Sequence, residues 1–478
     1  MKNIFAIFLT LLIFSSCTKL EELNVNTKDP TKVPGGSLFT GAQKRLADQM
    51  VTPNVNNNIF RMFTQQWTET TYIDESNYDI VTRPIPGNHW NVLYRDVLMN
   101  LKESAKVLKA DGPIPGDDKD VLPNKLAIVE IMTVYTYSVL VETFGNVPYT
   151  EALNQTIVLP KYDDGLSIYK DLIARLNAAI GTMNQNQGSF GSYDNMYGGD
   201  VAKWYKFANS LKLRMGLLLS DVDGALAQAT AEAAAPNVIA SNSDNAKMAY
   251  LPDQPNNNPI NENLVNSGRN DFVAANTLVD VMNDLSDPRR SLFFTPLSDN
   301  TYSGGIYGAS NDFTKFSHVN PAVTEATYPQ NFFDLAEVEF LLAEAAERGF
   351  NVGGTAEEHY NKAITASIID WGGTAEDASA YLATAKVAYS TATGTWQQKI
   401  GTQKWIGLYN RGFESWTAYR MLDFPVLVAP ATAESVLPLR LTYPTTEQTL
   451  NGANRSSAAI ALGVFGDAVK QPLFWDKH

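Results

Sequence analysis

Two segments of the chain combine aromatic side chains with hydrogen-bonding groups in the way that a sugar-binding surface requires. Sugars offer arrays of hydroxyls and apolar C–H faces, so a site for them needs aromatic platforms flanked by amides and carboxylates. Residues 65–78, QQWTETTYIDESNY, supply this mixture, and residues 302–308, YSGGIYG, add tyrosines beside glycines that let a backbone approach a ligand. The two segments predict ligand contacts from Trp67, Tyr72, Asp74, Asn77, Tyr78, Tyr302 and Tyr307.

The aromatic candidates also have a packing interpretation. Trp67 and Trp90 fit helix packing, which is the commoner role of a tryptophan in a folded chain. Tyr302 and Tyr307 fall in a predicted loop, where ligand contact and packing are both open.

Catalytic and metal-binding patterns are not found. His89, His318, His359 and His478 are scattered singly, and no two of them have the helical spacing of a zinc site. The sequence has no G-x-S-x-G, GxGxxG or Walker pattern. Adjacent carboxylates such as Asp74 and Glu75 point in different directions, whereas a glycosidase pair needs carboxyls roughly 5–9.5 Å apart across a substrate. We expect no catalytic residue, no bound metal and no cofactor; an extracellular glycoside hydrolase is a less favoured alternative.

Cys17, the only cysteine among 478 residues, has the setting of a lipidation site. A positively charged start is followed by the apolar run 4–14, which suits a secretory signal and is too short to span a bilayer. Ser15 and Ser16 are the small residues that a signal peptidase requires before its cut. Attachment of a diacylglyceryl group through a thioether needs a thiol. Residues 1–16 are therefore predicted to be a signal peptide and Cys17 to carry the membrane anchor.

The segment behind Cys17 is acidic and polar. Glu21 and Glu22 lie within five positions of the cysteine and resemble the export signal of surface lipoproteins in Bacteroidetes-type outer membranes. The stretch LNVNTKDPTKVP at 23–34 predicts an extended tether. We expect residues 17–35 to connect the anchor to one folded domain, residues 36–478.

The composition limits what this domain can bind. A formal charge of −14 at neutral pH repels phosphate backbones, which argues against a nucleic-acid partner. No further cysteine is present for a disulfide, so stability must come from core burial, for which a 44% hydrophobic chain is sufficient.

Helical periodicity dominates the domain. Apolar residues recur at helical spacing in the ranges 90–101, 126–149 and 204–218. Asp334 is a predicted cap for a helix that ends near Gly349, and Thr355 with Glu358 forms a capping box for the next helix, which ends at 372–373. Such a helical hairpin is the unit of a tetratricopeptide-like stack, here without a strict repeat. Long loops at 184–200, 251–263 and 297–331 are expected to be either functional or disordered.

Several segments together resemble the SusD/RagB family of outer-membrane nutrient-binding lipoproteins. They follow the family's order across nearly the whole chain after the leader: LNVNTKDPTKVP (23–34), ETFGNVPYTEAL (142–153), KWYKFANSLKLRM (203–215), FFDLAEVEFLLAEAAERG (332–349), QKWIGLYNRGFESWTAYR (403–420), PLRLTYPTTEQTLNGANR (438–455) and QPLFWDK (471–477).

The resemblance implies a mainly α-helical SusD-like fold, in which degenerate tetratricopeptide-like helix pairs form a scaffold and long irregular loops face the ligand. It also implies a lipid-anchored, surface-exposed protein of the outer membrane, with a SusC-like TonB-dependent transporter as partner. The expected function is capture of an oligosaccharide nutrient and its delivery to that transporter. Capture of a peptide, as in some relatives, and a scaffold that binds only protein are the alternatives.

Overall fold

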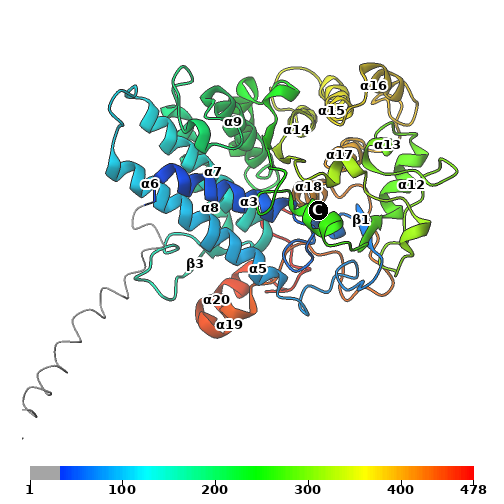
Figure 1. The fold of residues 1–478 in the computed structure, drawn as a ribbon, viewed down its shortest axis with the longest axis horizontal. Helices are drawn as coiled ribbons and strands as arrows, with labels where there is room; N and C mark the ends of the chain where they lie inside the picture. The colour runs from blue at the N-terminus through cyan, green and yellow to red at the C-terminus, as the bar shows by residue number, and fades with distance from the viewer. Residues whose placement is uncertain (1–32, 478) are drawn as a thin grey trace, which may run out of the picture.

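The computed structural model describes residues 33–477, and helices make up most of their regular structure (Figure 1). The predicted leader, Cys17 and nearly all of the tether lie outside the described residues. The helices of eight or more residues are α3 (Gly35–Val51), α6 (Met99–Asp111), α7 (Val121–Phe144), α8 (Gly165–Thr182), α9 (Val201–Leu217), α10 (Gly224–Ala234), α12 (Asn276–Asp284), α14 (Leu335–Glu347), α15 (Ala356–Asp370), α16 (Ala375–Leu382), α17 (Trp396–Gly407), α18 (Gly412–Leu422) and α20 (Gly452–Leu462).

Shorter helical turns and three small sheets connect these helices. The turns are α4 (Phe60–Phe63), α5 (Ile85–Asn91), α11 (Pro259–Asn261), α13 (Arg290–Phe293), α19 (Thr445–Leu450), the π-helical η1 (Val92–Leu98) and η5 (Glu262–Asn266), and the 3-10 turns η2 (Gly191–Tyr193), η3 (Ala235–Asn237), η4 (Asn242–Asp244), η6 (Phe313–Lys315) and η7 (Pro321–Thr324). Each sheet is an antiparallel pair: β1 (Trp67–Glu69) with β5 (Phe272–Ala274), β2 (Val147–Pro148) with β3 (Tyr162–Asp163), and β4 (Ala246–Met248) with β6 (Gln330–Phe333). The mainly α fold predicted from the sequence is confirmed.

Local sequence signals set the ends of the predicted helical hairpin. The Asp334 carboxylate accepts a hydrogen bond from the Glu337 amide at 2.8 Å and begins α14. Gly349 follows α14 in a left-handed conformation (φ 81°), and Thr355 and Glu358 form the predicted capping box at the start of α15. The two helices pack against each other, as do α7 with α8 and α9 with α10. The hairpin prediction is confirmed, whereas the tetratricopeptide-like character of the stack stays a prediction.

The helix α7 forms the centre of one half of the molecule. Among residues 33–477 it is the one helix long and apolar enough to cross a bilayer, but most of that apolar stretch is buried inside the protein. Its neighbours are α6, α8 and α9, so the apolar surface is covered on several sides (Figure 1). We therefore assign α7 to the core, where it organises the surrounding helices.

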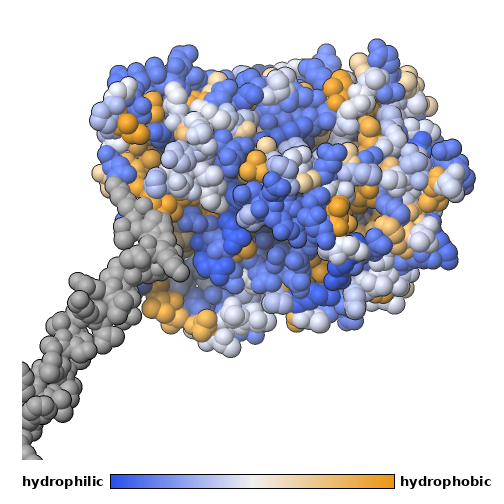
Figure 2. Space-filling model, in the orientation of Figure 1, coloured by the Kyte–Doolittle hydropathy of each residue, from blue (hydrophilic) through white to orange (hydrophobic). Residues whose placement is uncertain are grey.

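The two helical regions and the loops occupy different parts of the molecule. Figure 1 shows α3 and α6–α9 on one side, α14–α17 on the other, and irregular segments gathered around β1. In Figure 2 the middle of this face is mainly hydrophilic, and apolar residues gather over α19 and α20, where Leu450 and Ile460 are exposed. The hydrophilic middle includes the region around β1.

A buried cluster of charges joins the two helical regions. Glu337, in the first turn of α14, pairs with Arg411 and with Arg214 of α9, whose Nη1 lies 3.3 Å from the carboxylate. Arg411 also reaches the Asp334 carboxylate at 3.0 Å. Burial alone would raise the pKa of Glu337, but the two guanidinium groups outweigh burial and hold that pKa below its ordinary value. The carboxylate is therefore ionised, and its charge is compensated inside the protein.

Replacing Arg411 with Met should strongly destabilise the protein, because Asp334 would stay buried without its cation and Glu337 would keep only Arg214. Removing one partner of a buried ion pair costs about 3–5 kcal/mol, which denaturant unfolding can measure. The matched control is Lys386→Ala, which breaks an exposed ion pair with Asp284 and should change the free energy of unfolding by less than about 1 kcal/mol. Equal effects of the two substitutions would contradict a structural role for the buried cluster.

Candidate ligand-binding site

The structure brings the two predicted segments together. The Asn77 amide donates a hydrogen bond to the Gly308 carbonyl at 2.8 Å, and the rings of Tyr78 and Tyr307 lie 6.2 Å apart between centroids. Gly308 is required at this contact, since it has φ 78° and an added Cβ would lie 2.4 Å from Pro430. Residues separated by more than two hundred positions thus form one local region.

Most of the predicted aromatic platforms are not available to a ligand. The exposed fractions of Trp67, Tyr78 and Tyr307 are 0%, 1% and 8%. Trp67 donates its indole N–H to the Tyr409 hydroxyl at 2.9 Å, and its ring packs against Phe272. The expectation that these three rings offer open faces is wrong, because each is covered by the core, and the packing interpretation holds for Trp67.

Of the other predicted contacts, Asn77 is buried, Tyr302 is partly buried and Asp74 is exposed. The side-chain amide of Asn77 donates hydrogen bonds to the carbonyls of Ile73 and Gly308. Tyr302 is partly buried, with the Arg290 guanidinium 5.5 Å from its ring centroid. Asp74 is exposed, and its carboxylate lies 3.9 Å from Arg83. Ligand contact by these side chains is not tested by the structure and stays a prediction.

Tyr72 is the predicted aromatic residue that the structure leaves open. Its side chain is 70% exposed, and its backbone has φ 55°, a left-handed conformation that is costly for a residue with a side chain. Gln65 and Tyr78, in the same segment, have φ 53° and 63°. Such strained residues cluster at ligand clamps, at a cost of about 1–3 kcal/mol each. The backbone of this segment therefore directs the Tyr72 side chain toward solvent.

Tyr72 stands at the edge of a polar concavity of about 320 Å³, here called the Tyr72 hollow. The hollow is formed by residues 53–56, the end of β1 with the following turn, Arg83, and the segment 262–272. Side chains with amide and charged groups line it, including Asn54, Asn56, Glu75, Asn263, Arg269 and Asp271. An exposed ring beside several hydrogen-bonding groups is the arrangement that binds a polar ligand with an apolar face.

Two buried carboxyls form the inner wall of the hollow. Glu69 accepts hydrogen bonds from Ser76, including one from its backbone amide at 2.9 Å, and Glu75 pairs with the Arg83 guanidinium. Burial raises the pKa of Glu69 well above its ordinary 4.5, and the nearby Glu75 carboxyl adds to this effect, so Glu69 keeps its proton at neutral pH.

The sequence indicated only part of the hollow. The loop 251–263 was expected to be either functional or disordered, and its last residues reach the lining. Asn54, Asn56 and Arg83 were not anticipated, although a run of asparagines at 56–58 is a visible polar signal. In residues 33–477 no group of three or more histidine, cysteine or acidic side chains is placed to hold a metal ion.

Comparison with known proteins identifies the family. Residues 27–444 match the family described as "Starch-binding associating with outer membrane". The chain belongs to this SusD-like family. No protein of curated function matches the chain in sequence.

Solved SusD-like structures share the fold over almost the full length. A chitin-binding protein has a TM-score of 0.81 and 26% identity, covering 93% of this chain and 100% of its own. A chitin-binding SusD homologue from Flavobacterium johnsoniae has a TM-score of 0.78 and 24% identity, covering 92% and 99%. A SusD homologue from Bacteroides thetaiotaomicron has a TM-score of 0.78 and 23% identity, covering 94% and 100%. The SusD-like fold predicted from the resemblance is thereby confirmed.

Replacing Glu69 with Gln should remove part of the pH dependence of stability. The folded protein keeps the Glu69 proton above pH 4.5, where an unfolded chain releases it, so the unfolded state binds fewer protons and stability falls as pH rises. Glutamine is uncharged at every pH, and its oxygen can still accept from Ser76. Unfolding in denaturant from acidic to alkaline pH should therefore show a smaller loss of stability in E69Q than in the unsubstituted protein.

The control for this measurement is Glu325→Gln, which changes an exposed glutamate in a loop. Its unfolding profile should follow that of the unsubstituted chain. An E69Q profile with the same slope as the control would show that Glu69 ionises normally in the folded state.

Proposed function

We propose that this protein is a surface-exposed, lipid-anchored member of the SusD-like family that captures an oligosaccharide in the Tyr72 hollow. It then passes the oligosaccharide to a SusC-like TonB-dependent transporter. The observation that carries the proposal is Tyr72, an exposed ring held in a strained backbone conformation at the edge of a polar concavity. A ring that folding leaves exposed at such a cost is explained by contact with a ligand.

The chemistry of the hollow suits a sugar. The face of Tyr72 offers a platform for the C–H face of a sugar ring, and the amides of Asn54, Asn56 and Asn263 can exchange hydrogen bonds with hydroxyls. Starch in the family description and chitin in the names of two solved relatives support an oligosaccharide.

A peptide is the second candidate ligand, and the charges at the rim favour it. Arg269 is largely exposed and pairs with Asp271 at 2.7 Å, so the rim offers both signs of charge to peptide termini and side chains. Oligosaccharide and peptide capture are distinguished by titrating the purified protein with either class of ligand.

Lipid attachment at Cys17 fits this function. Acyl chains bind the membrane because each buried methylene contributes about 0.8 kcal/mol, and the polar tether leaves the folded domain free to meet a transporter in the same membrane. Tethering keeps the two partners at a high local concentration without any additional contact between them.

Replacing Tyr72 with Ala should weaken oligosaccharide binding. Aromatic contacts contribute about 0.5–1.5 kcal/mol beyond area burial, which corresponds to an affinity roughly twofold to tenfold lower. Calorimetric titration with maltooligosaccharides and chitooligosaccharides measures this change. Phe465→Ala, which removes a partly exposed ring beyond α20, is the control and should leave affinity unchanged. Unaltered binding by the Tyr72 variant would place the ligand elsewhere.

Replacing Cys17 with Ser should abolish retention at the cell surface, because a hydroxyl cannot form the thioether. The purified domain should keep its full affinity for ligand, since the anchor acts only as a tether. Protease accessibility on intact cells and calorimetry on the soluble variant check the two parts separately. A variant that is still retained at the surface would contradict lipidation at this residue.

A further inference from the structure

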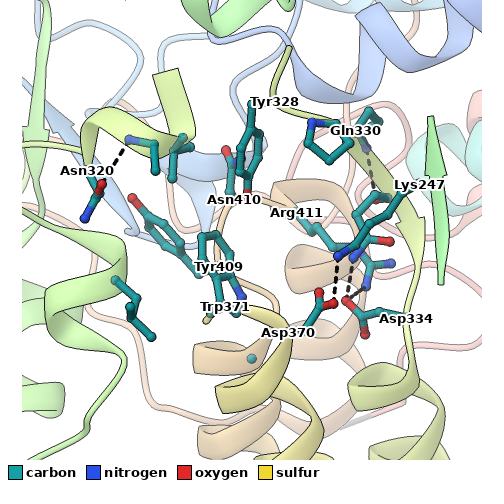
Figure 3. A pocket seen from close by; sticks show the side chains of 16 residues that line it. Lys247, Asn320, Tyr328, Gln330, Asp334, Asp370, Trp371, Tyr409, Asn410 and Arg411 are labelled. Atoms are coloured by element: carbon teal, nitrogen blue, oxygen red, sulfur yellow. Dashed lines mark hydrogen bonds and ion pairs between the residues drawn. The ribbon is translucent and has the colours of Figure 1, made fainter. Parts of the chain in front are cut away.

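A second cleft lies on the other side of the turn that joins α17 to α18, and it shares no lining residue with the Tyr72 hollow. This Trp371 cleft has a volume of about 320 Å³, which is within the range of small-molecule sites. It is formed by Lys247 of β4, the segment 320–331, the end of α15 at Asp370 and Trp371, and the turn 407–411 (Figure 3). None of the ligand contacts predicted from the sequence lies in it.

One wall of the cleft is aromatic. The Trp371 ring lies 5.6 Å from that of Tyr409 and 6.4 Å from that of Tyr328, and the three rings occupy the same side of the cleft in Figure 3. Tyr409 is buried, whereas Trp371 and Tyr328 are partly exposed. Six of the eight tryptophans in the chain are buried, and the other partly exposed one is Trp396, which lies outside the cleft. Trp371 therefore presents apolar surface within a concavity.

The opposite wall carries two ion pairs. Lys247 Nζ lies 2.7 Å from Asp370, and Arg411 Nη1 lies 3.0 Å from Asp334 (Figure 3). The two cations and two carboxylates that line the cleft cancel in formal charge. A ligand with a net charge would meet no uncompensated partner among these four groups, whereas hydroxyl groups can donate to the carboxylates and accept from Lys247.

Polar atoms next to the cleft are incompletely satisfied. Arg411 Nε and Asn331 Oδ1 are buried and have no hydrogen-bond partner within the described residues, and both residues line the cleft. An apolar ligand would also cover the charged groups of Lys247 and Asp370 without giving them partners, which is unfavourable. The wall thus favours a ligand rich in hydrogen-bonding groups.

We propose that the Trp371 cleft is a second saccharide-binding site, which takes a short, uncharged sugar segment. An apolar ring face fits the Trp371 wall, and hydroxyls fit the wall of Asp370 and Lys247. The proposal shares only its class of ligand with the function proposed above, because the two sites have different residues. A chain bearing two such sites would hold a long glycan at two points, which raises the overall affinity without any new contact.

Tryptophan quenching provides a direct readout of this cleft. In a Trp396→Phe variant, Trp371 is the one tryptophan that is not buried, so acrylamide should quench chiefly its emission. Maltotriose or N,N′-diacetylchitobiose should protect Trp371 from acrylamide, and the same protection should occur after Tyr72→Ala is added. The unsubstituted chain, titrated in parallel, shows whether the Trp396 change has altered binding.

Replacing Asp370 with Asn tests the polar wall while keeping its shape. A hydrogen bond to a charged group contributes about 1.5–3 kcal/mol, so the sugar concentration needed for protection should rise roughly tenfold or more. The matched control is Asp284→Asn, which alters an exposed lysine-paired carboxylate outside the cleft and should change nothing.

The outcomes separate this proposal from the preceding one. Failure of both sugars to protect Trp371, in a protein that binds them by calorimetry, would overturn the second site and leave oligosaccharide capture intact. Protection that disappears with Tyr72→Ala would also overturn it, because the sugar would then occupy the Tyr72 hollow alone. Absence of both protection and calorimetric binding would contradict the two proposals together.

Discussion

The structure depends on one guanidinium group that is almost entirely buried, that of Arg411. Arg411 precedes α18 and makes hydrogen bonds to Asp334, to Glu337 and to the Phe332 carbonyl. These three partners belong to the cap of α14, the first turn of α14 and the strand β6. One side chain therefore fixes the start of a long helix against the C-terminal helices. The interaction requires all partners together, because a buried charge without its counter-ion is far less stable than either a complete pair or an apolar replacement.

The same turn connects this buried cluster to the Tyr72 hollow. The side-chain oxygen of Asn410, next to Arg411, accepts a hydrogen bond from Arg61 Nε at 2.8 Å, and the backbone N–H of Asn410 donates to the Gln66 side chain at 3.1 Å. The Arg61 guanidinium lies over the Trp67 ring at 5.0 Å, and Trp67 begins β1. The strand leads directly into Glu69 and the turn that carries Tyr72. The strained conformation of Tyr72 is thus supported by a continuous set of buried contacts, which is what a non-glycine residue at positive φ requires.

Helix ends could be predicted from the sequence because their causes are local. Asp334, Gly349 and the capping pair of Thr355 with Glu358 act on backbone groups three or four residues away, and each performs the predicted role. The exposure of an aromatic ring has no local cause. Trp67 and Tyr72 lie five positions apart in one polar segment, yet one is buried and the other is open.

The difference between these two rings arises from distant residues. The hydroxyl that receives the Trp67 indole N–H belongs to Tyr409, 342 positions away along the chain. The hollow beside Tyr72 likewise needs residues 53–56 and 262–272 to meet at β1 and β5. No periodicity or motif records such a meeting, so the sequence could single out the two segments but not which of their side chains stay exposed. A segment that forms an open binding platform and one that forms a hydrogen-bonded core can have the same polar and aromatic composition.

Rigidity of the 409–411 turn has a consequence for both concavities. Tyr409 contributes to the aromatic wall of the Trp371 cleft, and its hydroxyl accepts the hydrogen bond from Trp67, the first residue of β1. One buried turn thus supports the walls of both concavities. Side chains fixed before a ligand arrives lose little further entropy on binding, which favours affinity for weakly interacting, uncharged molecules. A neutral sugar offers no strong ionic contact to offset the ordering of a flexible site. A scaffold held by buried charges, with rings and amides already in place at its surface, therefore suits the proposed binding of a neutral sugar.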